Sequence, residues 1–129
     1  MVVDTSAVVA IILREPAGDR LLDRIVAAPS REISMASYVE AASVLGPRGV
    51  THERLDAFLQ SLSITLVPVD EAQGRAAIQA RVAYGKGTGH PAQLNFGDTF
   101  TYALAKVRGA PLLFVGDDFA HTDLVSALT

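Results

Sequence analysis

The sequence predicts an α/β protein, a three-layer α/β/α sandwich around a central, mostly parallel sheet of four to five strands. Two observations support this prediction. Short apolar runs with the length of buried strands alternate along the chain with longer segments that have helical periodicity. Strands that alternate with helices form parallel sheets with both faces covered. With 129 residues, half of them apolar, we expect a single domain spanning residues 1–129.

The first half of the chain is expected to supply two strands and four helices. Pro16 and Pro29 each follow a segment with helical periodicity and should end it, as should the pair Gly46-Pro47. The last of these helices carries apolar residues on one face, namely Leu55, Phe58, Leu59 and Leu62. The expected elements are strand 1–3, a helix ending near residue 13, helix 17–27, strand 33–35, helix 37–45 and helix 52–62.

The second half continues the alternation. Strand 64–67 leads to Asp70, which is expected to cap a helix that ends near residue 83. Glycines dominate residues 84–94, which therefore read as a loop. Helix 96–107 and the apolar strand 112–115 complete the predicted sheet.

Acidic residues occur where the predicted strands give way to helices. They are Asp4, Glu40, Asp98 and the adjacent pair Asp117 and Asp118. In an open parallel sheet these junctions share one edge, the crevice outside the carboxyl ends of the strands. Carboxylates gathered there repel one another, and a hard divalent cation with oxygen ligands relieves the repulsion. The pattern therefore indicates a metal-dependent hydrolytic site.

Helix capping is an alternative explanation for three of these acids. Glu40 lies three residues after Ser37, and Asp98 three after Asn95, which is the spacing of a capping box; Asp4 could cap the first helix. Capping alone does not require a carboxylate, because Ser, Thr or Asn serves as well. Glu40 also lies among apolar neighbours, where an unpaired charge is costly. If repulsion dominates over capping, Asp4→Asn should stabilise the metal-free fold.

Composition excludes several classes of function. Eleven Lys and Arg against 14 Asp and Glu give a net charge of −3, so RNA or DNA must be held by a local basic patch or by bound metal. The absence of cysteine excludes disulfides, thiolate zinc sites and cysteine nucleophiles. The longest early apolar run is too short to span a bilayer and lacks the basic flank of a signal peptide, so we expect a soluble, cytoplasmic protein.

Four segments of the chain resemble the PIN-domain family, and more narrowly the VapC-type toxins of bacterial toxin-antitoxin pairs. They are residues 1–7, 38–41, 94–106 and 114–119, and their order and spacing match over nearly the whole chain. The 94–106 block is the most specific of the four. One departure is Gly46-Pro47, which interrupts the helix after Glu40 where relatives commonly continue it.

The resemblance implies a Mg²⁺- or Mn²⁺-dependent endoribonuclease that a VapB-type antitoxin silences and that forms a homodimer. By match of position, Asp4, Glu40 and Asp98 would form the acidic core, with either Asp117 or Asp118 as the fourth acid. Helices 17–27 and 37–45 would form the antitoxin groove, to which an apolar stripe would contribute Leu21, Leu22, Ile25 and Val26. The alternative is that this stripe packs on the sheet, which is the favoured interpretation for Leu22 and Ile25 taken alone. Independently of the resemblance, the composition of residues 84–90 fits either a solvated loop or a substrate flap, in which Lys86 and His90 meet phosphates and Tyr84 stacks on an unpaired base.

Two other classes fit less well. A receiver-like phosphoacceptor domain needs an acidic pair after the first strand, where this chain has Asp4 alone, and Asp70 is the nearest match to its phosphate acceptor. A haloacid-dehalogenase-like phosphatase needs two Asp two positions apart on the first strand, and Ser6 occupies the second position. A purely structural binding module would leave the clustered carboxylates unexplained.

Overall fold

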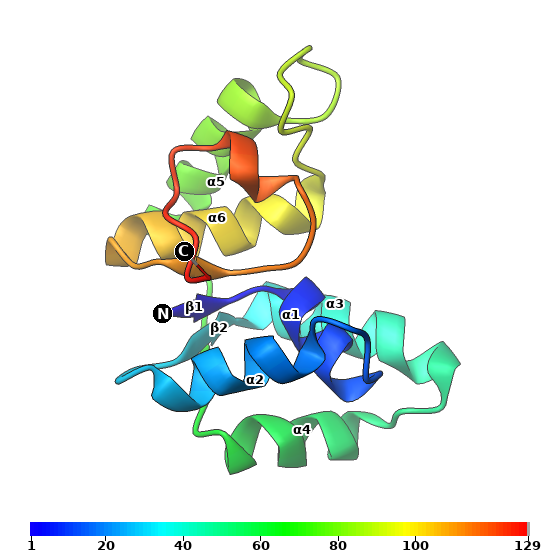
Figure 1. The fold of residues 1–129 in the computed structure, drawn as a ribbon. Helices are drawn as coiled ribbons and strands as arrows, with labels where there is room; N and C mark the ends of the chain where they lie inside the picture. The colour runs from blue at the N-terminus through cyan, green and yellow to red at the C-terminus, as the bar shows by residue number, and fades with distance from the viewer. Residues whose placement is uncertain (129) are drawn as a thin grey trace.

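Four parallel strands form one sheet at the centre of the molecule, in a computed structural model that describes residues 1–128 (Figure 1). The strand order is β3-β2-β1-β4, so β1 is paired on both sides. In chain order the elements are β1 (Val2–Val3), α1 (Thr5–Ile12), α2 (Gly18–Ala27), β2 (Glu32–Ser34), α3 (Met35–Leu45), η1 (Gly46–Arg48), α4 (His52–Ser61), β3 (Thr65–Val67), α5 (Glu71–Tyr84), α6 (Phe96–Arg108), β4 (Leu112–Leu113) and η2 (Phe119–His121).

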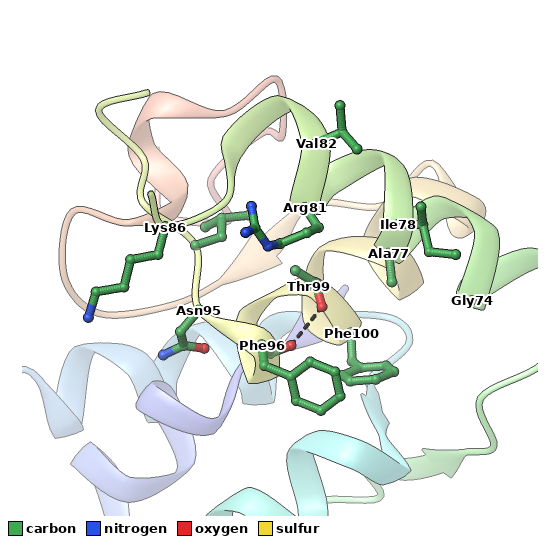
Figure 2. A pocket seen from close by; sticks show the side chains of 11 residues that line it. Gly74, Ala77, Ile78, Arg81, Val82, Lys86, Asn95, Phe96, Thr99 and Phe100 are labelled. Atoms are coloured by element: carbon green, nitrogen blue, oxygen red, sulfur yellow. Dashed lines mark hydrogen bonds between the residues drawn. The ribbon is translucent and has the colours of Figure 1, made fainter. Parts of the chain in front are cut away.

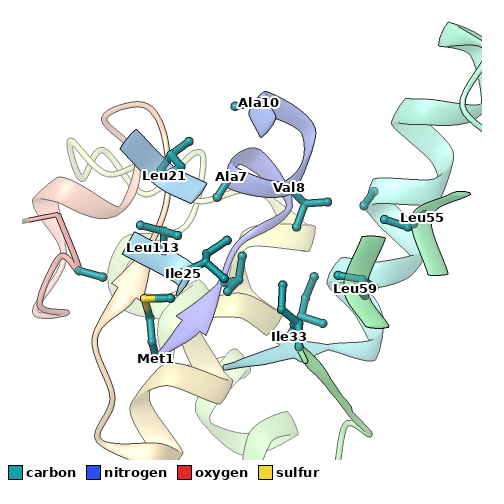
Figure 3. Close-up of a cluster of buried hydrophobic side chains, with 14 of the residues drawn as sticks. Met1, Ala7, Val8, Ala10, Leu21, Ile25, Ile33, Leu55, Leu59 and Leu113 are labelled. Atoms are coloured by element: carbon teal, nitrogen blue, oxygen red, sulfur yellow. The ribbon is translucent and has the colours of Figure 1, made fainter. Parts of the chain in front are cut away.

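The predicted three-layer α/β/α sandwich is confirmed. Successive residues of β1 face opposite layers, as the two-residue period of a strand requires. Val3 packs with α1–α4 in one core cluster, which Figure 3 shows around Ile33 and Leu113. Val2 packs in a second cluster with α6 and the end of α5. Helices α5 and α6 therefore cover one face of the sheet, and α1–α4 cover the other (Figure 1).

Most helices begin at a polar side chain that caps their first free amides. The side chains of the N-cap residues accept hydrogen bonds from backbone amides within the first turn at Asp4, Ser34, Thr51, Asp70 and Asn95. Helix α6 ends at Gly109, whose φ of 60° is the left-handed conformation that suits glycine. These local signals explain why the predicted order of elements is correct.

Three predicted boundaries are wrong in ways that matter for the site. Strand β2 ends at Ser34 and α3 begins at Met35, because Ser34 and not Ser37 caps this helix. Strand β4 stops at Leu113, since the amide of Val115 bonds to the Ser6 hydroxyl and not to a neighbouring strand. Gly46-Pro47 does end α3, and the chain continues as the short helix η1.

The chain after β4 returns to the sheet, a feature that the sequence did not predict. The amide of Leu112 donates to the carbonyl of Val125 at 2.9 Å, and the amide of Ala127 donates to the carbonyl of Leu112 at 2.8 Å. Residue Ser126 thereby forms a parallel bridge at the outer edge of β4. The segment covers part of an edge that would otherwise present free backbone groups.

The apolar stripe expected on α2 is largely part of the core. Leu21 and Ile25 are fully buried, whereas Val26 is 58% exposed. The stripe therefore does not offer a continuous apolar surface to a partner in this structure. None of the helices within residues 1–128 is long and apolar enough to cross a membrane.

Candidate acidic active site

The site lies at the carboxyl ends of β1 and β4, where the order of the sheet reverses. Strand β1 leads through β2 to β3 on one side, whereas β4 pairs on its other side. Such a switch point is where open α/β sheets form their binding crevices. Asp4 follows β1 directly, and its amide donates to the carbonyl of Leu113 at 2.9 Å, which ties this residue to the end of β4.

Asp4 is a buried carboxylate with three donors in place. Its Oδ2 accepts from the Ser6 amide at 3.0 Å and from the Ser6 hydroxyl at 2.6 Å, and its Oδ1 accepts from the Thr101 hydroxyl at 2.8 Å. Hydrogen bonds to an ionised carboxylate are stronger than those between neutral groups. Asp4 is thus structurally paired without a cation, so the structure does not support the expectation that Asp4→Asn would stabilise the metal-free fold.

Hydroxyl groups that the sequence reasoning missed hold this carboxylate. The Thr101 and Ser37 hydroxyls lie 2.8 Å apart, so Asp4, Thr101 and Ser37 form a buried chain. The Ser6 hydroxyl also accepts from the Val115 amide at 3.0 Å and so links Asp4 to the segment after β4. Thr101 could have been found, because it lies three positions after Asp98 and thus on the same helical face.

The Asp98 carboxyl takes part in the capping box of α6 and also has a raised pKa. Its Oδ2 accepts from the Asn95 amide at 3.0 Å, and the Asn95 side chain accepts from the Asp98 amide at 2.9 Å, which completes the predicted capping box. Burial nevertheless raises the pKa of the Asp98 carboxyl to about 7. The Asn95 hydrogen bond opposes this rise. Electrostatic repulsion adds to it, from the acids Asp4, Asp118 and Glu40.

Glu40 has no capping role. It is the sixth residue of α3, and the Ser37 hydroxyl that would have paired with it bonds to Thr101. Its carboxylate lies against Gly97 at the start of α6, so closely that a Cβ on Gly97 would overlap it. The capping explanation for Glu40 is therefore wrong, and its side chain is directed at the turn that carries Asp98.

The structure separates the two adjacent acids after β4. Both are exposed, but only Asp118 contributes to the raised pKa of Asp98. Asp118 precedes the short helix η2 and makes no side-chain cap there. Asp117 contributes its backbone carbonyl to the Ala120 amide. Of the two carboxylates, Asp118 is therefore the one that acts electrostatically on Asp98.

These acids offer a suitable set of donors to a hard divalent cation. All are oxygen ligands, and within residues 1–128 no Lys, Arg or His forms an ion pair with Asp4, Glu40, Asp98 or Asp118. No three of the acidic or histidine side chains in this part of the chain stand close enough to form a complete set of ligands. Mg²⁺ keeps several waters and needs only one or two carboxylates. The residues thus fit a partly hydrated ion.

The predicted substrate flap is tied to the body of the protein. The Lys86 amide donates to the Leu94 carbonyl and the Leu94 amide to the Tyr84 carbonyl, both at 2.8 Å. Tyr84 packs edge-on against His90 and also contacts Tyr102, so its ring is engaged inside the loop. The His90 ring accepts from the Ala92 amide. Of the three residues expected to meet RNA, only Lys86 has a side chain without a bonding partner among residues 1–128.

Comparisons with known proteins all point to the same protein family. The PIN domain model matches residues 1–125. Ribonuclease VapC42 of Mycobacterium tuberculosis is 44% identical over the full length of both chains, and Ribonuclease VapC of Mycolicibacterium smegmatis is 48% identical over 98% of each. Among solved structures, the Mycobacterium tuberculosis toxin VapC20, described as cleaving the sarcin-ricin loop, has a TM-score of 0.74 at 17% identity and covers 96% of this chain and 95% of its own. A toxin-antitoxin complex from Klebsiella pneumoniae has a TM-score of 0.72 at 16% identity, covering 98% of this chain and 96% of its own.

Proposed function

Because this chain belongs to the PIN domain family, in its VapC group, we propose that it is an endoribonuclease toxin that hydrolyses RNA phosphodiester bonds with the help of Mg²⁺ or Mn²⁺. The observation that carries the proposal is Asp98, a buried carboxyl whose pKa is raised by burial and by three other acids at the switch point of the sheet. Strongly perturbed acids in a crevice mark functional sites. The names of the VapC relatives support an RNA substrate.

Asp98 and Asp4 are the proposed direct ligands of the cation, with Glu40 and Asp118 holding its waters or a second ion. When bound, the ion supplies the positive charge that hydrolysis of a phosphodiester requires in its transition state. Ser6 and Thr101 fix both oxygens of Asp4, so this carboxylate keeps one orientation. Asp98 must lose its proton to act as a ligand, and binding of a cation favours that loss.

Two carboxylates near the proposed ion, those of Glu40 and Asp118, would also give the chain its own acceptors for the proton of an attacking water. Glu40 reaches the turn before Asp98 from α3, and Asp118 reaches the same cluster from the segment after β4. A carboxylate within hydrogen-bond reach of the water can accept its proton. We assign this role of proton acceptor to Glu40 or Asp118, and no catalytic role to Asp117.

The proposed partners follow from the same group of relatives. A cognate VapB-type antitoxin would silence the toxin in the cytoplasm, a proposal that the toxin-antitoxin complex found among the structural neighbours supports. An antitoxin arginine placed among the carboxylates would replace the charge of the cation. A homodimer is the proposed assembly, and light scattering on the purified chain tests it.

Nothing favours the receiver-like alternative. Asp70, the nearest match to a phosphate acceptor, caps α5 by accepting from the Gln73 amide at 2.9 Å. It follows β3, the strand at the outer edge of the sheet, and not the switch point.

The deciding experiment is incubation of the purified chain with total RNA in Mg²⁺, in Mn²⁺ or in EDTA, with the new RNA ends mapped. We expect cleavage with metal only, and Asp98→Asn should abolish it while the fold remains intact. The matched control is Asp117→Asn, the exposed neighbour of the cluster, which should cleave at the parental rate. Undiminished cleavage in excess EDTA, or by a folded Asp98→Asn variant, would reject the metal-dependent site.

A further inference from the structure

An apolar groove of about 430 Å³ runs between α5 and the start of α6 (Figure 2). Its volume lies in the range of small-ligand sites. Three of the large apolar side chains that line it are mostly exposed: Ile78 at 67%, Val82 at 72% and Phe96 at 79%. Figure 2 shows Ile78 and Val82 on the α5 side and Phe96 with Phe100 on the α6 side. Exposed apolar side chains that gather along one groove are a feature of interaction surfaces.

Among residues 1–128, the charged residues that line the groove are two cations, Arg81 and Lys86. Neither side chain forms an ion pair or hydrogen bond within residues 1–128, whereas the side chains of Arg75 and Arg108 pair with nearby acids. The Arg81 side chain lies over the backbone of Gly85, where a Cβ would collide with it. It extends toward the segment that carries Lys86 (Figure 2). In a chain of net charge −3, two unpaired cations at one apolar groove point to an anionic ligand.

The groove adjoins the acidic site. Phe96 is the first residue of α6 and precedes Asp98 by two positions, and Asn95, the partner of Asp98 in the capping box, also lines the groove. Phe96 meets Phe100 edge to face, with ring centroids 5.0 Å apart and an interplanar angle of 85°. Despite this contact, most of the Phe96 side chain stays exposed.

We propose that this groove binds a nucleobase of single-stranded RNA next to the bond that is cut. The base stacks on Phe96, with Ile78 and Val82 as the opposite apolar wall, and Arg81 and Lys86 contact the flanking phosphates. This inference rests on the proposed ribonuclease function and adds a binding site for the substrate. It also supplies the local cations that an acidic protein needs in order to hold a polyanion.

The charges of the groove favour RNA over a second copy of the chain. In a two-fold contact the same surface meets itself, so each copy would bury its unpaired Arg81 and Lys86 against a groove lined by no carboxylate. Phosphates give both cations a partner. A second copy in the groove is nevertheless an outcome that the experiment must detect.

The first test isolates stacking from general apolar contact. The probe is a short single-stranded oligoribonucleotide that carries a fluorescent adenine analogue, whose emission is quenched when it stacks on an aromatic ring, titrated at low salt in EDTA. We expect Phe96→Ala and Phe96→Leu to weaken binding about 5- to 150-fold and to abolish quenching, and Phe96→Tyr to bind within about twofold of the parental chain. The matched control is Val125→Ala, an exposed apolar side chain outside the groove, which should change nothing.

The second test measures the phosphate contacts. The logarithm of the binding constant falls with the logarithm of salt concentration, with a slope of about −0.7 per phosphate contact on a single strand. Arg81→Ala and Lys86→Ala should each reduce the slope by about 0.7. Arg75→Ala is the matched control, because Arg75 lies on the same helix but pairs with Glu71 and does not line the groove. Unchanged slopes for both groove variants would remove the phosphate contacts from the proposal.

Other results would overturn the proposal that the groove binds a nucleobase. If the Phe96→Leu variant binds and quenches the probe like the parental chain, no aromatic ring is needed. A parental dimer that Val82→Asp converts to a monomer in light scattering would show that a second copy covers the groove. Failure of the ribonuclease proposal can be told apart from failure of the nucleobase site. In that case the parental chain would bind and quench the probe but leave total RNA uncut in Mg²⁺. If the parental chain cleaves total RNA but does not quench the probe, the nucleobase site is rejected and the ribonuclease proposal stands.

Discussion

Removing the charge of Asp98 tests the electrostatic origin of the acidic site. The Asp98 carboxyl is buried, and its pKa is raised from 3.8 to about 7 in the folded chain, against the pull of the Asn95 amide. Asp98→Asn keeps a side-chain oxygen that can accept from that amide but has no proton to lose. The capping box should therefore survive while the electrostatic cost disappears.

The sign of the effect follows from the two pKa values. Between a pH of 3.8 and about 7 the folded chain keeps a proton that the unfolded chain has lost, so stability falls as pH rises through this window and then stays level. Three pKa units correspond to an upper limit of about 4 kcal/mol. Because solvent reaches the rim of the site, we expect about 1–3 kcal/mol.

Urea denaturation in EDTA, followed by circular dichroism at about pH 4 and about pH 8, measures this difference. At the lower pH the parental chain and Asp98→Asn should be equally stable, and at the higher pH the variant should be more stable by about 1–3 kcal/mol. Asp123, whose pKa is lowered by its hydrogen bond to Lys106, titrates below this window, and its contribution is the same in both chains. A variant that is less stable than the parental chain at the higher pH would refute the reasoning.

Two further substitutions test the supports of the site. Gly97→Ala should displace the Glu40 carboxylate and thereby lower RNA cleavage. The free energy of unfolding, measured by urea denaturation, should change by less than about 1 kcal/mol, because alanine favours the helix and the flexible Glu40 side chain can move aside. Gly46→Ala, with open space at its Cβ and no place in the acidic site or the groove, is the control and should cleave normally. Thr101→Val removes the buried donor to Asp4 and should cost about 1–3 kcal/mol in the same assay. Parental cleavage by Gly97→Ala, or parental stability of Thr101→Val, would contradict these roles.

The order of elements could be predicted because local signals agree with the fold. Capping residues such as Asp70 and Asn95, and breakers such as Pro16, mark the ends of helices in the sequence itself. The gathering of Asp4 and Asp98 was also predictable, since residues after parallel strands and at the start of the following helices share one edge.

The details of the site depend on contacts between segments far apart in the chain. Whether Ser34 or Ser37 capped α3 was decided by the Thr101 hydroxyl, which engages Ser37 from 64 residues away. The choice between Asp117 and Asp118 depends on how the segment after β4 turns. The stripe on α2 looked available because periodicity identifies an apolar face but not what covers it, and here Leu21 and Ile25 pack in the core.

The position of β1 has a consequence for protein synthesis. This strand is made first, yet its partner β4 follows 110 residues later in the register Val2–Leu112. The carboxylates of the site are spread in the same way, from Asp4 to Asp118. A chain still growing on the ribosome therefore carries an incomplete cluster of acids until Asp118, five residues after β4, has been made. A product that stops before β4 would lack both Asp118 and the strand that pairs with β1 in the register Val2–Leu112.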